Sequence, residues 1–128
     1  MTLRLTIRPL IHLSSLFFSP CYSVYLGLND NQFEGPVPSE MGRLFNMTRL
    51  QMQSNSFTGT LPNALGGMEK LEQFTIESNR LSGEVPLELC HLLQEGNLNQ
   101  FVVDCYSQRE RIGFDCEPDC CTLCRDVQ

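Results

Sequence analysis

Hydrophobic and polar positions alternate in three short segments that recur at a constant distance along the chain. In segments 26–28, 50–52 and 74–76 the first and last positions are apolar and the middle one is Gly, Gln or Thr. A strand with one buried face shows a period of two. The segments lie 24 residues apart, so they predict three strands that run in the same direction and stack into one parallel sheet.

The same 24-residue period extends beyond the strands and aligns apolar, glycine, proline and asparagine positions. The aligned columns are Asn31, Asn55 and Asn79; Gly35, Gly59 and Gly83; Pro38, Pro62 and Pro86; Phe33, Phe57 and Leu81; Val37, Leu61 and Val85; and Met41, Leu65 and Leu89. A unit of this size cannot bury its apolar face alone, so neighbouring units must provide the core.

The polar columns predict how the chain leaves each strand. The asparagine is expected to turn inward and bond backbone groups at the bend, and the glycine to relieve the backbone there. The proline favours an extended return segment and excludes a central ladder partner. Segments 39–45 and 63–69 have room for no more than a helical turn or two.

A fourth strand is expected at 98–103, which aligns with 71–76 at a spacing of 27 residues and therefore places three extra residues in the loop at 92–97. Tyr106 stands where the asparagine column would continue. We expect one parallel sheet from segments 24–30, 48–54, 72–78 and 99–104.

Residues 47–66, MTRLQMQSNSFTGTLPNALG, carry a family resemblance. They resemble the plant-type extracellular leucine-rich repeat, L-x-x-L-x-L-x-x-N-x-F-x-G-x-I/V/L-P-x-x-L/M-G, and the likeness covers residues 23–104 as three complete repeats and a fourth strand. The resemblance implies a right-handed α/β solenoid with its parallel sheet on the concave face and a short helical or irregular convex side. In plants such repeats form receptor-kinase ectodomains and inhibitors of cell-wall-degrading enzymes such as polygalacturonases.

Residues 1–22 form a separate segment that is either signal-like or disordered. Arg4 and Arg8 precede a short apolar stretch at 10–18, which is followed by small residues; this is the outline of a secretory signal. The alternative is a damaged first repeat or a misassigned start. Nothing here matches the cysteine-paired N-terminal cap of the family, and we expect the N-terminal end to be the weak point of the solenoid.

Seven cysteines in 128 residues point to an oxidising compartment. We expect disulfides at Cys90, Cys105, Cys116, Cys120, Cys121 and Cys124. If a signal were removed after Ser23, Cys21 would leave with it and the remaining six could pair without remainder. A zinc site at Cys116, Cys120, Cys121 and Cys124 is the alternative, although adjacent cysteines seldom ligate one ion and no second C-x2-C element follows. Segment 105–128 resembles the cysteine-rich C-terminal cap of diatom leucine-rich-repeat proteins.

Charge and composition narrow the function classes. The net charge is -6 and no cluster of Lys and Arg offers a stripe for phosphates, so nucleic-acid binding is not expected. No apolar run reaches the roughly 18 residues that a membrane span requires. His12 and His91 suggest no Ser/His/Asp arrangement. Glu77 and Asp104 are expected side by side on an open, solvated sheet face, which offers little for acid–base catalysis. We therefore expect no enzyme, metal or cofactor.

The remaining candidate is the concave face of the sheet. Its outward positions predict a binding surface made of Tyr25, Arg49, Gln51, Gln53, Gln73, Thr75, Glu77 and Gln100. Hydrogen-bonding side chains on rigid strands suit a protein, peptide or glycan ligand. The alternative is a structural or truncated fragment of a larger surface receptor-like protein. Asn46, in Asn46-Met47-Thr48, is a glycosylation sequon, and we expect an extracellular or cell-surface location.

Overall fold

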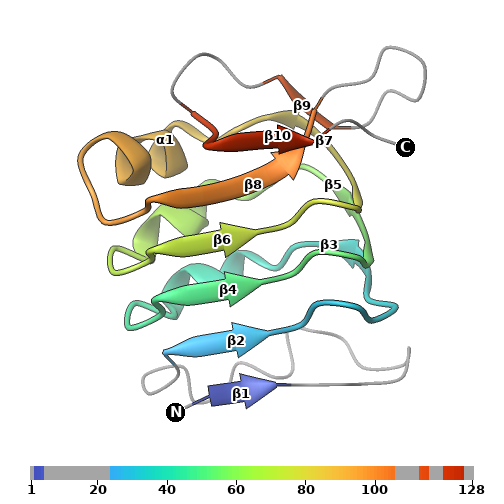
Figure 1. Cartoon of the computed structure of the whole chain (residues 1–128), viewed down its shortest axis with the longest axis horizontal. Coiled ribbons are helices and arrows are strands. Elements are labelled where there is room, and N and C mark those ends of the chain that lie inside the picture. The colour runs from blue at the N-terminus through green and yellow to red at the C-terminus, as the bar shows by residue number, and fades with distance from the viewer. Residues whose placement is uncertain (1, 5–23, 106–112, 116–119, 126–128) are drawn as a thin grey trace.

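The computed structural model of the chain describes residues 2–4, 24–105, 113–115 and 120–125. Short strands alternate with helical turns, and successive repeats lie on top of one another (Figure 1). The elements are β1 (Thr2–Arg4), β2 (Tyr25–Gly27), β3 (Glu34–Pro36), η3 (Ser39–Arg43), β4 (Arg49–Gln51), β5 (Ser56–Gly59), η4 (Asn63–Gly67), β6 (Gln73–Thr75), β7 (Arg80–Glu84), α1 (Leu87–Gln94), β8 (Gln100–Asp104), β9 (Gly113–Asp115) and β10 (Leu123–Arg125).

The larger sheet is parallel and has the strand order β1-β2-β4-β6-β8-β10. Its register aligns Leu26 with Leu50, Leu50 with Phe74, and Phe74 with Phe101. The parallel sheet predicted from the 24-residue period and from the fourth strand is therefore confirmed. Within the segment expected to be signal-like, Thr2–Arg4 form β1 and pair with β2; the remainder of 1–22 lies outside the described residues.

A second parallel sheet, β3-β5-β7-β9, was not predicted. It begins after the bend, where Gly35 and Gly59 have φ values of 82° and 79°. Only glycine adopts this region without strain. Pro36 belongs to β3, which is an edge strand of this sheet, so its missing N–H removes no central ladder bond. The columns of prolines at 38, 62 and 86 follow the strands and directly precede η3, η4 and α1 in extended conformation.

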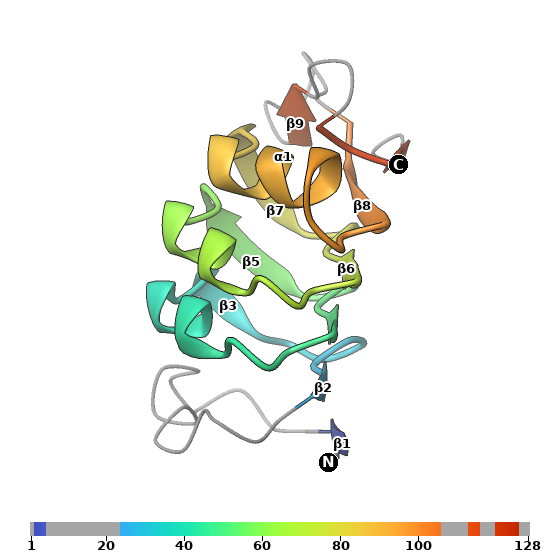
Figure 2. The same cartoon turned by 90° about the vertical axis from the view of Figure 1, so that its left-hand side faces the viewer.

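Short helices cover the convex side, as expected. η3 and η4 are each five residues of 3-10 helix, and α1 is eight residues of α-helix. Figure 2 shows them one above the other, and η4 contacts both η3 and α1. A Cβ atom on Gly42 would collide with the backbone of Ala64, and one on Gly66 with the side chain of Glu88. Glycine at these positions lets the helices of neighbouring repeats approach closely.

The core lies between the larger sheet and the convex elements and is continuous from the first repeat to the fourth strand. Two aromatic pairs stack across repeats: Phe33 with Phe57 at 6.1 Å between ring centroids, and Phe74 with Phe101 at 5.2 Å. The aliphatic members include Leu26, Leu50, Met52, Leu65, Met68, Leu71 and Leu89, all buried. Each repeat thus supplies one layer, and neighbouring layers bury each other's apolar faces.

The asparagine column behaves as predicted. The side-chain amide of Asn55 donates to the carbonyl oxygens of Leu28, at 2.8 Å, and Met52, at 3.1 Å, and its Oδ1 accepts from the N–H of Phe33 at 3.1 Å. Asn79 repeats this pattern one level higher. Each side chain therefore satisfies backbone groups at the bend of its own repeat and of the one before.

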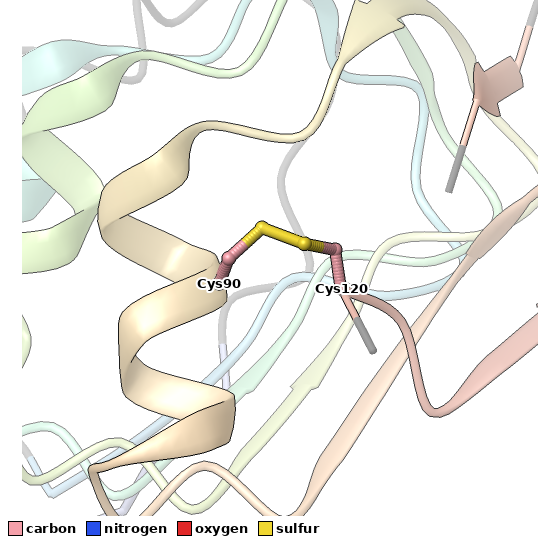
Figure 3. The surroundings of a disulfide bond; sticks show 2 residues. All are labelled: Cys90 and Cys120. Carbon is pink, nitrogen blue, oxygen red and sulfur yellow. A yellow bond between two sulfur atoms is a disulfide. The ribbon is translucent and has the colours of Figure 1, made fainter. Parts of the chain in front are cut away.

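The C-terminal end is tied down by disulfides. Cys90 on α1 is bonded to Cys120, which precedes β10 (Figure 3). Cys105 and Cys121 are also disulfide-bonded. β10 then pairs with β8 as the last strand of the larger sheet. The side chains of Cys116 and Cys124 lie outside the described residues, as do Cys21 and Tyr106, so their expected roles stay predictions.

Candidate binding face

The outward side chains of the larger sheet, called the concave face below, fall into rows that run across the strands. The register aligns Tyr25 with Arg49, Arg49 with Gln73, and Gln73 with Gln100. We call Arg49, Gln73 and Gln100 the open row. A second row contains Gln51 and Thr75. The structure thus brings the predicted site residues together on one face, with neighbouring members about 4.8 Å apart along each row.

Tyr25 and Gln51 are engaged with each other. The Tyr25 hydroxyl donates to Oε1 of Gln51 at 2.5 Å, and the phenol ring lies across Gly27, where a Cβ atom would come within 2.9 Å of the hydroxyl oxygen. The guanidinium of Arg49 lies 5.8 Å from the centre of the same ring, within the range of a cation–π contact. Tyr25 therefore positions both neighbours, and its own hydroxyl is already bonded to the protein.

Gln53 and Thr75 form a second pair. The Thr75 hydroxyl donates to Oε1 of Gln53 at 2.9 Å, and both side chains are half-buried. A hydrogen bond of this kind across two strands fixes the rotamers of both partners. These two predicted site residues therefore shape the floor of the face, and a ligand would compete with an existing bond to reach them.

The open row differs from these pairs. Gln73 is half-buried and Gln100 is exposed, and among the described residues neither amide has a side-chain hydrogen-bond partner. Arg49 is exposed beside them and is oriented by Tyr25. Two amides and one guanidinium thus present donors and acceptors to solvent from three adjacent strands, without having to break a side-chain hydrogen bond within the described part of the chain.

One expectation for this face is wrong. We expected Asp104 beside Glu77 on an open, solvated surface, but Asp104 is only 7% exposed. Its two carboxylate oxygens accept from the N–H groups of Ser78, at 2.8 Å, and Asn79, at 3.2 Å. Val102 is 2% exposed in the same strand, which β10 flanks. Glu77 is half-buried. The pair is therefore not a solvated acid pair, because Asp104 is part of the interior hydrogen bonding.

Comparison with known proteins identifies the type of repeat. A family model described as Leucine Rich Repeat matches residues 46–68 and 70–92. The fold is a leucine-rich-repeat solenoid. No curated protein matched the chain in a sequence search.

Solved structures of plant receptor ectodomains are similar to this leucine-rich-repeat solenoid. The ectodomain of the Arabidopsis receptor kinase HAESA, in complex with an N-terminally extended IDA peptide hormone, is 34% identical with a TM-score of 0.54, and the match covers 64% of this chain and 13% of that one. The ectodomain of the receptor kinase GASSHO1/SCHENGEN3 from Arabidopsis thaliana, in complex with CASPARIAN STRIP INTEGRITY FACTOR 2, is 29% identical with a TM-score of 0.56, covering 64% and 9%.

A third structure, PEPR1-AtPEP1, covers 92% of this chain and 16% of that one with a TM-score of 0.68 at 21% identity, which shows likeness of fold alone. The chain thus spans 9% to 16% of the length of these three proteins. The repeats are of the kind found in plant receptor ectodomains, as the motif indicated. The likeness of segment 105–128 to diatom caps stays a prediction.

The repeat motif does not predict how the backbone hydrogen bonds between successive repeats end after the third repeat. In the earlier repeats the N–H groups of Asp30 and Ser54 donate to the backbone carbonyls of Gln53 and Glu77 in the next repeat. At the equivalent place in the third repeat, the N–H of Ser78 donates to the Asp104 carboxylate instead. An aspartate at the end of the last regular strand was the available signal, but its column assigned it to the solvent side.

The sequon of this leucine-rich-repeat protein lies in the loop before β4. Asn46 is half-buried, and its Oδ1 accepts from Nζ of Lys70 at 2.9 Å. The Thr48 hydroxyl donates to the carbonyl of Val24 at 3.0 Å. The loop is at the N-terminal edge of the strands, so a sugar there would border the concave face.

Within residues 2–4, 24–105, 113–115 and 120–125, no three His, Cys, Asp or Glu side chains are grouped so that they could hold a metal ion. None of the helices in that part of the chain is long and apolar enough to cross a membrane.

Proposed function

We propose that this chain is a non-catalytic recognition module of the extracellular leucine-rich-repeat type, which binds a protein or peptide through its concave face. The observation that carries the proposal is the open row, in which Arg49, Gln73 and Gln100 present hydrogen-bonding groups side by side from three paired strands. The backbone of a polypeptide offers carbonyl acceptors and N–H donors that such a row can bond.

The fixed neighbours of the open row favour specific binding. Tyr25 with Gln51, and Thr75 with Gln53, are bonded to each other before any ligand arrives. A surface whose side chains are already ordered loses less conformational entropy on association. Glu77 lies at the far end of the strands on the same face and adds one acidic group to a surface whose cation is Arg49. Glycan binding is the outcome to be separated from polypeptide binding by experiment.

Similar structures support this assignment by analogy. The structures of HAESA and GASSHO1/SCHENGEN3 are complexes of leucine-rich-repeat ectodomains with IDA and with CASPARIAN STRIP INTEGRITY FACTOR 2. Each match covers 64% of this chain but a small part of the whole ectodomain. We transfer the general mode of recognition, namely a ligand bound by the repeats, and leave the ligand itself open.

We further propose that the protein is extracellular or at the cell surface. The Cys90–Cys120 disulfide, together with those of Cys105 and Cys121, fits an oxidising compartment. Segment 1–22 would then serve as a secretory signal, and Asn46 as a glycan acceptor. His91 and Glu77 do not form a catalytic pair, because His91 lies on α1 at the convex side, away from Glu77 and the concave face.

The decisive experiment compares the open row with a matched set on the opposite side. The immobilised chain, an Arg49→Ala/Gln73→Ala/Gln100→Ala variant and an Arg43→Ala/Gln94→Ala control are each exposed to extracellular extract, and retained molecules are identified by mass spectrometry. A partner held by the wild type and the control, and lost from the open-row variant at unchanged melting temperature, supports the proposal. Equal retention by all three, or retention of nothing, would contradict it.

A second candidate is a structural repeat fragment of a larger surface receptor-like protein, with no independent activity. The observation that favours it is the small share of the matched ectodomains that the chain spans, which is 9% for GASSHO1/SCHENGEN3. In that case the open row would contact other parts of the same protein. The experiment above separates the two candidates, because a fragment would retain no partner from the extract.

A further inference from the structure

A groove on the convex side, remote from the concave face, lies between equivalent positions of the second and third repeats. It has a volume of about 430 Å³ and is bounded by segments 60–63 and 84–88, at the points where the chain passes from the second sheet into η4 and α1. Leu61 and Val85 belong to the apolar columns and form the inner part. Thr60, Asn63, Glu84 and Leu87 lie around them.

Leu87 is the unusual residue of this groove. It is the first residue of α1 and is 65% exposed, which is more than any other large hydrophobic side chain in the described part of the chain. The equivalent positions in the first and second repeats are Ser39 and Asn63. The period therefore places a polar residue at this position in the first two repeats and a leucine only in the third, so this leucine is not required by the fold.

The charges around Leu87 are of one sign. Glu84 and Glu88 both border the groove and both are exposed. The second repeat has Thr60 and Ala64 at these positions, and the first has Pro36 and Glu40, so the third is the only one of the three repeats that carries both carboxylates. Among the residues that the structure describes, no Lys, Arg or His belongs to the lining. Two full negative charges outweigh the half positive charge that a helix N-terminus contributes, and the net charge of -6 adds to the attraction of a cation.

We propose that this groove is a second recognition site, which takes a short basic–apolar segment of a partner protein. An apolar side chain of the partner would contact Leu87 and Val85, and a neighbouring lysine or arginine would pair with Glu84 and Glu88. The wall of the groove is held in place because Gly66 lets η4 approach the side chain of Glu88. A volume of this size is that of one ligand-sized pocket rather than of an extended interface, so the occupant is a short segment.

The chain supplies its own control substitutions. Leu87→Asn, and the pair Glu84→Thr with Glu88→Ala, introduce the residues that the second repeat carries at the same positions. Because that repeat folds with them, the melting temperatures should stay close to that of the wild type. The probe is a synthetic peptide of alternating leucine and lysine with one tryptophan; since the protein contains no Trp, the tryptophan fluorescence reports on the peptide alone.

The expected result is saturable binding of the leucine–lysine peptide to the oxidised full chain. Leu87→Asn should weaken it roughly tenfold through lost apolar burial. Glu84→Thr with Glu88→Ala should weaken it by a similar factor and reduce its salt dependence. A peptide with glutamate in place of lysine should not bind, and the open-row variant on the concave face should bind as the wild type does.

Four results would overturn the assignment. The first is equal affinity for the wild type and for both groove variants. The second is binding of a serine–lysine peptide as tightly as of the leucine–lysine peptide, which would reduce the effect to surface charge. The third is concentration-dependent self-association in sedimentation that Leu87→Asn abolishes, because the occupant would then be a second copy of the chain. Loss of peptide binding in the open-row variant alone would place the ligand on the concave face instead.

Discussion

The side-chain amide of Asn79 donates a hydrogen bond to the backbone carbonyl of Met52, in the preceding repeat, at 3.1 Å. The same amide donates to Ile76 at 2.9 Å within its own repeat, and its Oδ1 accepts from the N–H of Phe57 at 3.0 Å. Asn79 is 6% exposed. One side chain thus bonds backbone groups of two repeats where neither could reach water.

Replacement of this asparagine should therefore be costly. Asn79→Ala removes the side-chain partner of the Ile76 carbonyl and of the Phe57 N–H, and we expect a loss of about 2–4 kcal/mol in the free energy of unfolding. Urea denaturation with the disulfides intact is the measurement. Asn99→Ala, at an exposed position before β8, is the control and should change the same quantity by no more than about 0.5 kcal/mol. Equal effects of the two substitutions would contradict the role given to Asn79.

Asp104 accepts hydrogen bonds from backbone N–H groups at the bend of the third repeat. Asp104→Ala removes the acceptor of both Ser78 and Asn79, and we expect a loss of about 2–4 kcal/mol, since the buried N–H of Asn79 and the part-buried N–H of Ser78 are left unsatisfied. Asp104→Asn keeps one side-chain oxygen and should recover part of this loss. Amide hydrogen exchange at Ser78 and Asn79 should accelerate in the alanine variant. Unchanged protection of both amides would show that the carboxylate is not their partner in solution.

The Cys90–Cys120 bond joins residues 30 positions apart and reduces the number of conformations open to the unfolded chain. Replacing both cysteines by alanine should lower the free energy of unfolding by about 3–4 kcal/mol on the loop-closure estimate. Thermal denaturation of the variant and the wild type under oxidising conditions measures the difference. The two proteins should converge when both are reduced, and a variant that melts with the oxidised wild type would contradict the prediction.

Phe74 is fully buried and stacks on Phe101, while the equivalent residue of the second repeat is Leu50. Phe74→Leu introduces the side chain that the neighbouring layer already uses and should cost no more than about 1.5 kcal/mol. Phe74→Ala leaves a cavity and should cost about 3–5 kcal/mol. Both are measured as shifts of the urea midpoint. Similar shifts for leucine and alanine would mean that the layer can collapse around the site.

The sequence predicts the larger sheet because its strands coincide with a period that also aligns asparagine, glycine and proline. It does not predict the second sheet, since segments such as 34–36 and 56–59 are short, contain glycine or proline, and show no alternation of their own. Their pairing is a consequence of stacking and appears only when the repeats are placed on one another.

The candidate site, like the fold, could be predicted from the sequence only in part. Which side chains face outward follows from the alternation along each strand, so the membership of the concave face could be predicted. Which of them are already bonded could not, because the Tyr25–Gln51 and Thr75–Gln53 bonds depend on rotamers. The expectation that Asp104 is solvated was wrong for a related reason. The column at this position is defined by strands that have another complete repeat stacked on them. β8, by contrast, is flanked by β10, which is not part of a regular repeat.

The parallel strands have a mechanical consequence. Their hydrogen bonds point from one repeat to the next, along the direction in which the strands are stacked (Figure 1). Tension between the two ends of the stack therefore loads the interfaces one after another, so that they would peel apart in sequence at low force, whereas tension along a strand would shear all its bonds at once. The Cys90–Cys120 link halts such peeling at the last interface, because α1 and the segment before β10 stay covalently joined however far the other repeats are pulled.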